Sequence, residues 1–115
     1  MQRHLPWICT VALTAAFVAT AAGGNGEMLG VARLAADPDN DRAEYAIMVR
    51  SDMKGQGIGY QLMRTLLDYA RRVGIKTVFG EVLRENTTML KMVKELGFTI
   101  AGDEDPGVVK ASIAP

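Results

Sequence analysis

The sequence has few of the residues on which several classes of protein depend. Its 115 residues include one cysteine, Cys9, and one histidine, His4. A single cysteine excludes an internal disulfide framework, and these two residues lack the spacing of zinc ligands, so we expect no metal. Thirteen basic and thirteen acidic residues give no net charge. Domains that bind nucleic acid electrostatically usually carry a clustered basic excess, so we expect no nucleic-acid partner.

Long hydrophobic runs are also scarce, and the one candidate spans residues 5–22. It is barely long enough for a transmembrane helix and has few large apolar residues, so we expect no membrane partner. Its small-residue end is typical of a secretory signal peptide, but Pro6 and three threonines interrupt it. Residues 15–21 also fit a strand before a tight Asn-Gly turn. We adopt the strand and a cytoplasmic location, with export as the alternative if residues 1–22 are a signal peptide.

Hydrophobic periodicity predicts an α+β fold in the order β-β-β-α-β-α-β-β, a mainly antiparallel mixed sheet flanked by two helices. Short turns join the first three strands into a meander, in which Gly30 marks a bulge. The first helix is a crossover, so the strands before and after it should be parallel. Asn86 is the expected N-cap of the second helix, and Gly97 its C-terminal cap. The expected strands span residues 15–21, 28–35, 42–49, 76–82, 98–101 and 108–113, and the first helix spans residues 58–73.

Three glycines, Gly55, Gly57 and Gly59, lie close together between the third strand and the first helix. Glycine lets a ligand approach the backbone, and the first N–H groups of a helix lack partners and carry partial positive charge. The segment is therefore a candidate seat for a phosphate or pyrophosphate. Its spacing is one position short of the dinucleotide pattern G-x-G-x-x-G. Tyr60 and Gln61 follow where a nucleoside-triphosphate loop needs a lysine and a hydroxyl.

Residues 54–59, K-G-Q-G-I-G, resemble the R/Q-x-x-G-x-G/A signature of the GNAT acetyltransferase superfamily. Residues 86–98, N-T-T-M-L-K-M-V-K-E-L-G-F, resemble its second hallmark, an asparagine-started helix that ends in L-G-F. The two motifs follow one another in the superfamily's order. Residues 26–59 are similar to the acetyltransferase domain of bacterial protein lysine acetyltransferases. In several of those proteins the domain is fused to acyl-CoA-synthetase-like modules.

The resemblance implies that acetyl-CoA is the cosubstrate, with its pyrophosphate on the backbone N–H groups of residues 56–60. Its pantetheine arm would pair with the preceding strand like an added strand. The lysine of the motif would meet a phosphate as a point charge. The asparagine of the second motif would bond the cofactor or an ordered water, or would be only an N-cap. The implied cofactor-binding residues are Met48, Val49, Lys54, Gly55, Gln56, Gly57, Ile58, Gly59, Tyr60 and Asn86.

Acyl transfer to an amine needs a base that deprotonates the amine. In related lysine acetyltransferases this base is a glutamate on the strand before the loop, and Glu44 occupies that place. The alternatives are that Glu44 is an ordinary solvated glutamate, or that Glu81 on the next strand is the base. The superfamily often has a tyrosine in the second helix as the general acid, where this chain has Val93. The resemblance therefore implies catalysis by Glu44 with no tyrosine acid at that position.

The superfamily usually begins with a strand and two helices that wall the acceptor site. Here only the atypical segment of residues 1–14 precedes the expected domain of residues 15–115. We expect an N-acetyltransferase that acts on an amine of a protein lysine or of a small molecule. Self-association or a fused synthetase-like domain would replace the missing wall. The alternative is a non-catalytic acetyl-CoA-binding regulatory domain, or a fragment of a larger acetyltransferase.

Overall fold

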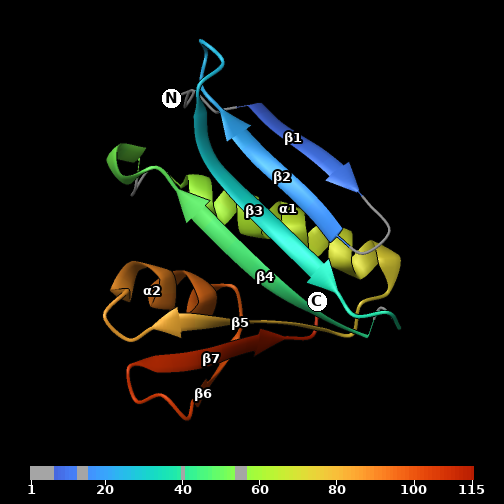
Figure 1. Cartoon of the computed structure of the whole chain (residues 1–115), viewed down its shortest axis with the longest axis vertical. Coiled ribbons are helices and arrows are strands. Elements are labelled where there is room, and N and C mark those ends of the chain that lie inside the picture. Colours follow the sequence, from blue (N-terminus) through green and yellow to red (C-terminus); the bar gives the residue numbers. More distant parts are fainter. Residues whose placement is uncertain (1–6, 13–15, 40, 54–56) are drawn as a thin grey trace.

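The computed structural model describes residues 7–12, 16–39, 41–53 and 57–115. They form a seven-stranded mixed sheet in the order β1-β2-β3-β4-β5-β7-β6, together with two α-helices (Figure 1). The strands are β1 (Trp7–Ala12), β2 (Ala16–Ala22), β3 (Met28–Ala36), β4 (Arg42–Val49), β5 (Thr77–Leu83), β6 (Thr99–Gly102) and β7 (Val108–Ile113). The helices are α1 (Ile58–Val73) and α2 (Thr87–Glu95), and a short 3-10 helix, η1, spans Ser51–Met53.

The predicted α+β class is confirmed. β4, α1 and β7 have the predicted bounds, β3 is one residue longer at its end, and β2, β5 and β6 each begin and end one residue later than predicted. Strand pairs are antiparallel except β4 and β5, which are parallel, as the α1 crossover requires. Periodicity and turn signals were therefore sufficient for the order and type of these elements.

The strand β1 was not predicted. It lies within the segment expected to be atypical, and it pairs antiparallel with β2 from Trp7↔Ala22 to Ala12↔Phe17. The expected strand at residues 15–21 is confirmed as β2, which has β1 on one side and β3 on the other. The sequence of β1, W-I-C-T-V-A, is rich in residues that favour strands, but it lies within the candidate signal segment, and its pairing at the edge of the sheet was not predicted.

One part of the core lies between α1 and the strands β2, β3 and β4, and α1 crosses behind these strands in Figure 1. Small side chains on the strands let the helix approach closely, and Ala19, Ala21, Ala32 and Ala43 are all buried. On β4 the buried residues alternate with exposed ones, so that Glu44, Ala46 and Met48 lie on the opposite, uncovered face. The buried face of α1 consists of Ile58, Leu62, Met63, Leu66, Leu67 and Ala70.

Gly30 lies where β3, β4 and the first turns of α1 meet. A Cβ at this position would be 3.1 Å from the Met48 carbonyl oxygen and 3.2 Å from Leu62 Cδ1. The β2–β3 register shifts beside it, since Ala21 pairs with Gly30 whereas Ala22 pairs with Met28. The bulge predicted at Gly30 is therefore present, with Leu29 as the extra residue. The missing side chain allows α1 to begin directly against the end of β4.

Both helices end in the same hydrogen-bonding pattern. At the end of α2, the Gly97 N–H bonds the Lys94 carbonyl at 3.1 Å and the Phe98 N–H bonds the Val93 carbonyl at 2.9 Å. Gly97 has a φ of 97°, which confirms the predicted glycine cap. Neither helix in the described part of the chain is long and apolar enough to cross a membrane.

Candidate active site

β4 and β5 pair at only three positions and then separate. The parallel register runs from Arg42↔Thr77 to Glu44↔Phe79, while β4 continues to Val49. On its other edge β5 pairs with β7 from Val78 to Leu83. Figure 1 shows the two strands together near the start of β4 and apart at its end. The last residues of β4 therefore keep one backbone edge without a strand partner, which suits an extended ligand.

A cavity of about 440 Å³ lies where the end of β4, the start of α1 and one side of α2 meet. β4 contributes Ile47, Met48 and Val49 to its lining. The helices lie close together here, because a Cβ on Gly59 would be 3.5 Å from Val49 Cγ2 and 3.8 Å from Met92 Sδ. The sheet edge and the helix start that the glycine motif predicted to share a ligand therefore line one cavity.

The start of α1 presents unpaired N–H groups at this cavity. Gly57 is the N-cap with a φ of 82°, a left-handed conformation that favours glycine. Its carbonyl accepts from the Gln61 N–H at 3.1 Å. The N–H groups of Ile58, Gly59 and Tyr60 precede that bond and have no partner inside the helix. These three residues and Gly57 line the cavity, so a phosphate could bind there. Lys54, Gly55 and Gln56 lie outside the described residues.

Asn86 occupies the start of α2 and also lines the cavity. Its side-chain oxygen accepts a hydrogen bond from the Met89 N–H at 3.1 Å, which confirms the predicted N-cap. The cap orients this side chain next to the cavity, and a contact between Asn86 and a cofactor remains a prediction.

One side of α2 lines the cavity, and sequence reasoning did not find it. The residues Thr88, Lys91, Met92 and Glu95 recur at the helical spacing i, i+3, i+4 and i+7. That periodicity is present in the sequence, but the apolar stripe of α2 predicted only the contact of this helix with the core. Lys91 is exposed and adds a cation to a site whose other positive charge comes from the start of a helix.

Glu44 lies at the last paired position before β4 and β5 separate. It faces Ala35 on β3 and Phe79 on β5 in the register, and its side chain is exposed on the uncovered face of the sheet. It is not among the residues that line the cavity. Glu81 is also exposed and pairs with Lys110 of β7 in the register.

Val93, Tyr45 and Tyr60 differ in burial and in their position relative to the cavity. Val93 is fully buried in the core, so its position does not open on the cavity. Tyr45 is also buried, whereas Tyr60 lines the cavity. The Arg64 guanidinium lies over the Tyr60 ring at 5.9 Å from its centroid. Of these residues, only Tyr60 could contact a ligand in the cavity.

The chain matches the Acetyltransferase (GNAT) family over residues 3–98. This match covers most of the chain, and the protein therefore belongs to the GNAT acetyltransferase family. The resemblance found in its two sequence motifs is confirmed.

Three relatives illustrate the similarity. The chain is 28% identical over 106 residues to the L-methionine sulfoximine/L-methionine sulfone acetyltransferase of Pseudomonas aeruginosa, covering 89% of this chain and 62% of that protein. It superimposes on the GNAT domain of S. lividans PAT with a TM-score of 0.79 and 26% identity, covering 89% of this chain and 62% of that one. A cAMP-binding acyltransferase from Mycobacterium smegmatis gives a TM-score of 0.74 and 29% identity, with 91% of this chain and 33% of that chain covered. The chain thus spans less than two thirds of the length of each of these relatives.

Proposed function

We propose that the protein is an N-acetyltransferase that transfers the acetyl group of acetyl-CoA to an amine. The observation that carries this proposal is the separation of β4 from β5 beside the unpaired N–H groups at the start of α1. The pyrophosphate would bind at Gly57 to Tyr60, and the pantetheine arm would lie along Met48 and Val49. Lys91 and Asn86 stand at the same cavity and would add a charge and a hydrogen-bonding group.

In the proposed reaction Glu44 accepts a proton from the acceptor amine. The amine nitrogen attacks the thioester carbonyl, a C–N bond forms and the C–S bond breaks. Val93 is buried and offers no acid. The sulfur therefore leaves as a thiolate, as the modest pKa of a thiol allows, or takes a proton from water. Glu44 suits this role because it lies where the two strands part, on the face that no helix of the described chain covers.

We propose a protein lysine as the acceptor, on the similarity of residues 26–59 to bacterial lysine acetyltransferases. A small amine is the alternative, because one relative is named as an acetyltransferase of L-methionine sulfoximine and L-methionine sulfone. The exposed face around Glu44 would border either acceptor. A second copy of the chain or a fused synthetase-like domain would also border the acceptor site.

A cytoplasmic location is part of the proposal. β2 coincides with the end of the candidate signal segment, and its Ala19 and Ala21 are buried in the core. Cleavage near Ala22 would remove both side chains together with β1 and β2.

Acetyl-CoA binding and acetyl transfer test the function separately. Calorimetry should show acetyl-CoA binding, and mass spectrometry should show acetylated lysines on candidate proteins or an acetylated small amine. Binding without transfer to any amine would favour the non-catalytic alternative. The absence of binding would contradict the whole proposal.

Glu44→Gln tests the base. We expect kcat to fall about a hundredfold with acetyl-CoA affinity unchanged, because only the proton acceptor is lost. Glu81→Gln is the matched variant on the neighbouring strand and should keep its kcat. If kcat falls in Glu81→Gln and is unchanged in Glu44→Gln, then Glu81 is the base and the assignment of Glu44 is wrong.

A further inference from the structure

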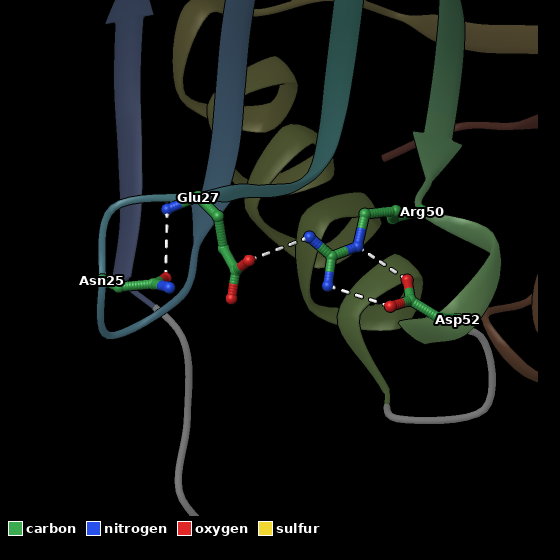
Figure 2. Close-up of polar contacts among 4 residues, drawn as sticks. All are labelled: Asn25, Glu27, Arg50 and Asp52. Atoms are coloured by element: carbon green, nitrogen blue, oxygen red, sulfur yellow. Dashed lines mark hydrogen bonds and ion pairs between the residues drawn. The ribbon is translucent and has the colours of Figure 1, made fainter.

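Arg50, the residue directly after β4, is held by two carboxylates from different parts of the chain. Its Nε and Nη2 donate to the two oxygens of Asp52, at 2.6 and 3.0 Å. Its Nη1 donates to Glu27 Oε2 at 3.1 Å. Figure 2 shows the guanidinium lying between the two carboxylates. The paired bonds to Asp52 fix the plane of the guanidinium as well as its position.

The Glu27 side of this arrangement is anchored in the turn between β2 and β3. The Gly23 N–H bonds the Glu27 carbonyl at 2.8 Å, and the Gly26 N–H bonds the Gly23 carbonyl at 3.0 Å. The Glu27 N–H also points to the Asn25 side-chain oxygen at 3.4 Å (Figure 2). The β2–β3 turn is therefore closed by its own hydrogen bonds. Arg50 links η1 to this turn, because it bonds Asp52 on one side and Glu27 on the other.

Arg50 also lies next to the cavity without lining it. Val49, its neighbour, lines the cavity and pairs with Gly30 of β3. The Arg50 N–H then bonds the Leu29 carbonyl at 2.8 Å, which extends the β3–β4 pairing by one residue. At the other side of the connection, the start of α1 is held by the buried Ile58. The contacts of Arg50 thus hold the first part of the connection whose last part supplies the helix N–H groups.

We propose that Arg50, Glu27 and Asp52 form a positioning cluster that fixes the end of β4 and η1 beside the cavity where acetyl-CoA would bind. The proposal rests on the proposed function. The cluster binds no phosphate itself and acts through the chain between Val49 and η1. Fixing that chain before the ligand arrives raises affinity, because less conformational freedom is lost on binding.

Stability alone does not account for the cluster. The side chains of Arg50, Glu27 and Asp52 are 39%, 45% and 65% exposed. Exposed ion pairs contribute little to folding stability. The hydrogen bonds from Arg50 nevertheless orient both carboxylates. Those to Asp52 hold the pKa of its carboxyl below its usual range.

Neutralising a carboxylate of the cluster distinguishes a positioning role from a simple electrostatic effect on the ligand, because the two predict opposite changes in acetyl-CoA affinity. Coenzyme A is an anion, so the loss of a nearby negative charge would by itself tighten its binding. A positioning cluster predicts the reverse. We expect Glu27→Gln and Asp52→Asn each to weaken acetyl-CoA binding by about two- to fivefold, the scale of an exposed ion pair. Arg50→Lys keeps the charge but loses the two-pronged geometry, and it should weaken binding as well.

The experiment is calorimetry with acetyl-CoA on the whole chain, with steady-state kinetics beside it. Glu104→Gln, an exposed carboxylate of the last turn, is the control for the loss of one negative charge and should leave binding unchanged. The cluster variants should raise the KM for acetyl-CoA while kcat and the KM for the amine stay the same. Thermal melting without ligand should shift little, which separates positioning from unfolding.

Tighter or unchanged binding by Glu27→Gln and Asp52→Asn, with normal binding by the unaltered chain, would overturn this inference alone. Full affinity in Arg50→Lys would also overturn it, since charge without orientation would then suffice. If the unaltered chain does not bind acetyl-CoA, the proposed function fails, and the inference fails with it.

Discussion

Tyr45 carries a polar hydroxyl group into the apolar core. It is 6% exposed, and its ring meets the Phe98 ring edge-on with centroids 5.8 Å apart. Its hydroxyl is buried and has no hydrogen-bond partner among the described residues. Burial raises the pKa of Tyr45 to about 12 from an ordinary value of 10.0. Tyr45 therefore belongs to the core, and it does not line the cavity.

Raised pH should destabilise the fold through Tyr45. Its folded-state pKa is above the unfolded value, so the stabilisation is complete below pH 10 and is lost as the pH rises toward 12. The unfolded chain releases the phenolic proton first, and the loss should reach roughly 2 kcal/mol. Urea unfolding at a series of pH values between 8 and 11.5 measures it.

Tyr45→Phe is the control for this titration. It should abolish the part of the alkaline destabilisation that belongs to Tyr45. At pH 7 it should be as stable as the unaltered chain or more stable by about 1 kcal/mol, because it removes a buried hydroxyl without a partner. A variant that loses stability at pH 7 would show that the hydroxyl has a partner in solution.

At the scale of elements, glycines set how closely the strands and helices approach. Gly30 brings α1 against β3 and β4, and Gly80 on β5 makes room for the Tyr45 ring. A Cβ on Gly80 would lie 2.3 Å from Tyr45 Cε2, which no real contact allows. Gly30 therefore shapes the region where the end of β4 meets α1, and Gly80 shapes the region where β4 and β5 separate.

Gly80→Ala should destabilise the protein by about 3 kcal/mol, because the new methyl group overlaps a buried ring that cannot move into solvent. Gly102→Ala is the matched control in β6, where a Cβ would meet nothing within 4 Å. It should change the free energy of unfolding by less than about 0.5 kcal/mol. Equal stability of the two variants in urea would mean that Tyr45 does not occupy this space.

At the scale of the whole molecule, the cavity lies between two parts of the sheet that pair with each other at only three positions. β4 and α1 belong to the side of β1 to β3, whereas α2 lies beside β5, β6 and β7 (Figure 1). A ligand that contacts the end of β4, the start of α1 and α2 would bind the folded state alone. Binding should therefore stabilise the entire domain by mass action.

Acetyl-CoA at about one hundred times its Kd should raise the free energy of unfolding by about 2.7 kcal/mol. Lys91→Gln should reduce this gain, because Lys91 lines the cavity. Lys76→Gln removes the same charge at a position paired with Asp41, away from the cavity, and should leave the gain unchanged. Melting curves with and without acetyl-CoA give both values, and an equal gain in the two variants would remove Lys91 from the site.

Much of this molecule follows from local sequence. The bounds of β4 and α1, the cap at Asn86 and the turn glycines are consequences of side-chain periodicity and backbone conformation, which act over a few residues. The cavity side of α2 depends on neighbours far away in the chain, whereas the unpredicted β1 pairs with the adjacent β2 and was missed because its residues lie within the candidate signal segment. For the same reason the sequence could nominate Glu44 but could not show that it stands where two strands part.

The sequence by itself determined the family and the order of the elements from β2 to β7, and it predicted the start of α1 as a candidate seat for phosphate. These are properties of short motifs, because hydrogen bonding and periodicity within a helix or strand are local. Only the tertiary structure decided that β4 and β5 pair at three positions and then separate, and that α2 closes the cavity. It also decided that Arg50 reaches Glu27, a carboxylate remote in the chain, as well as the nearby Asp52. Such features arise from the packing of side chains that are remote in sequence, and no local pattern encodes them.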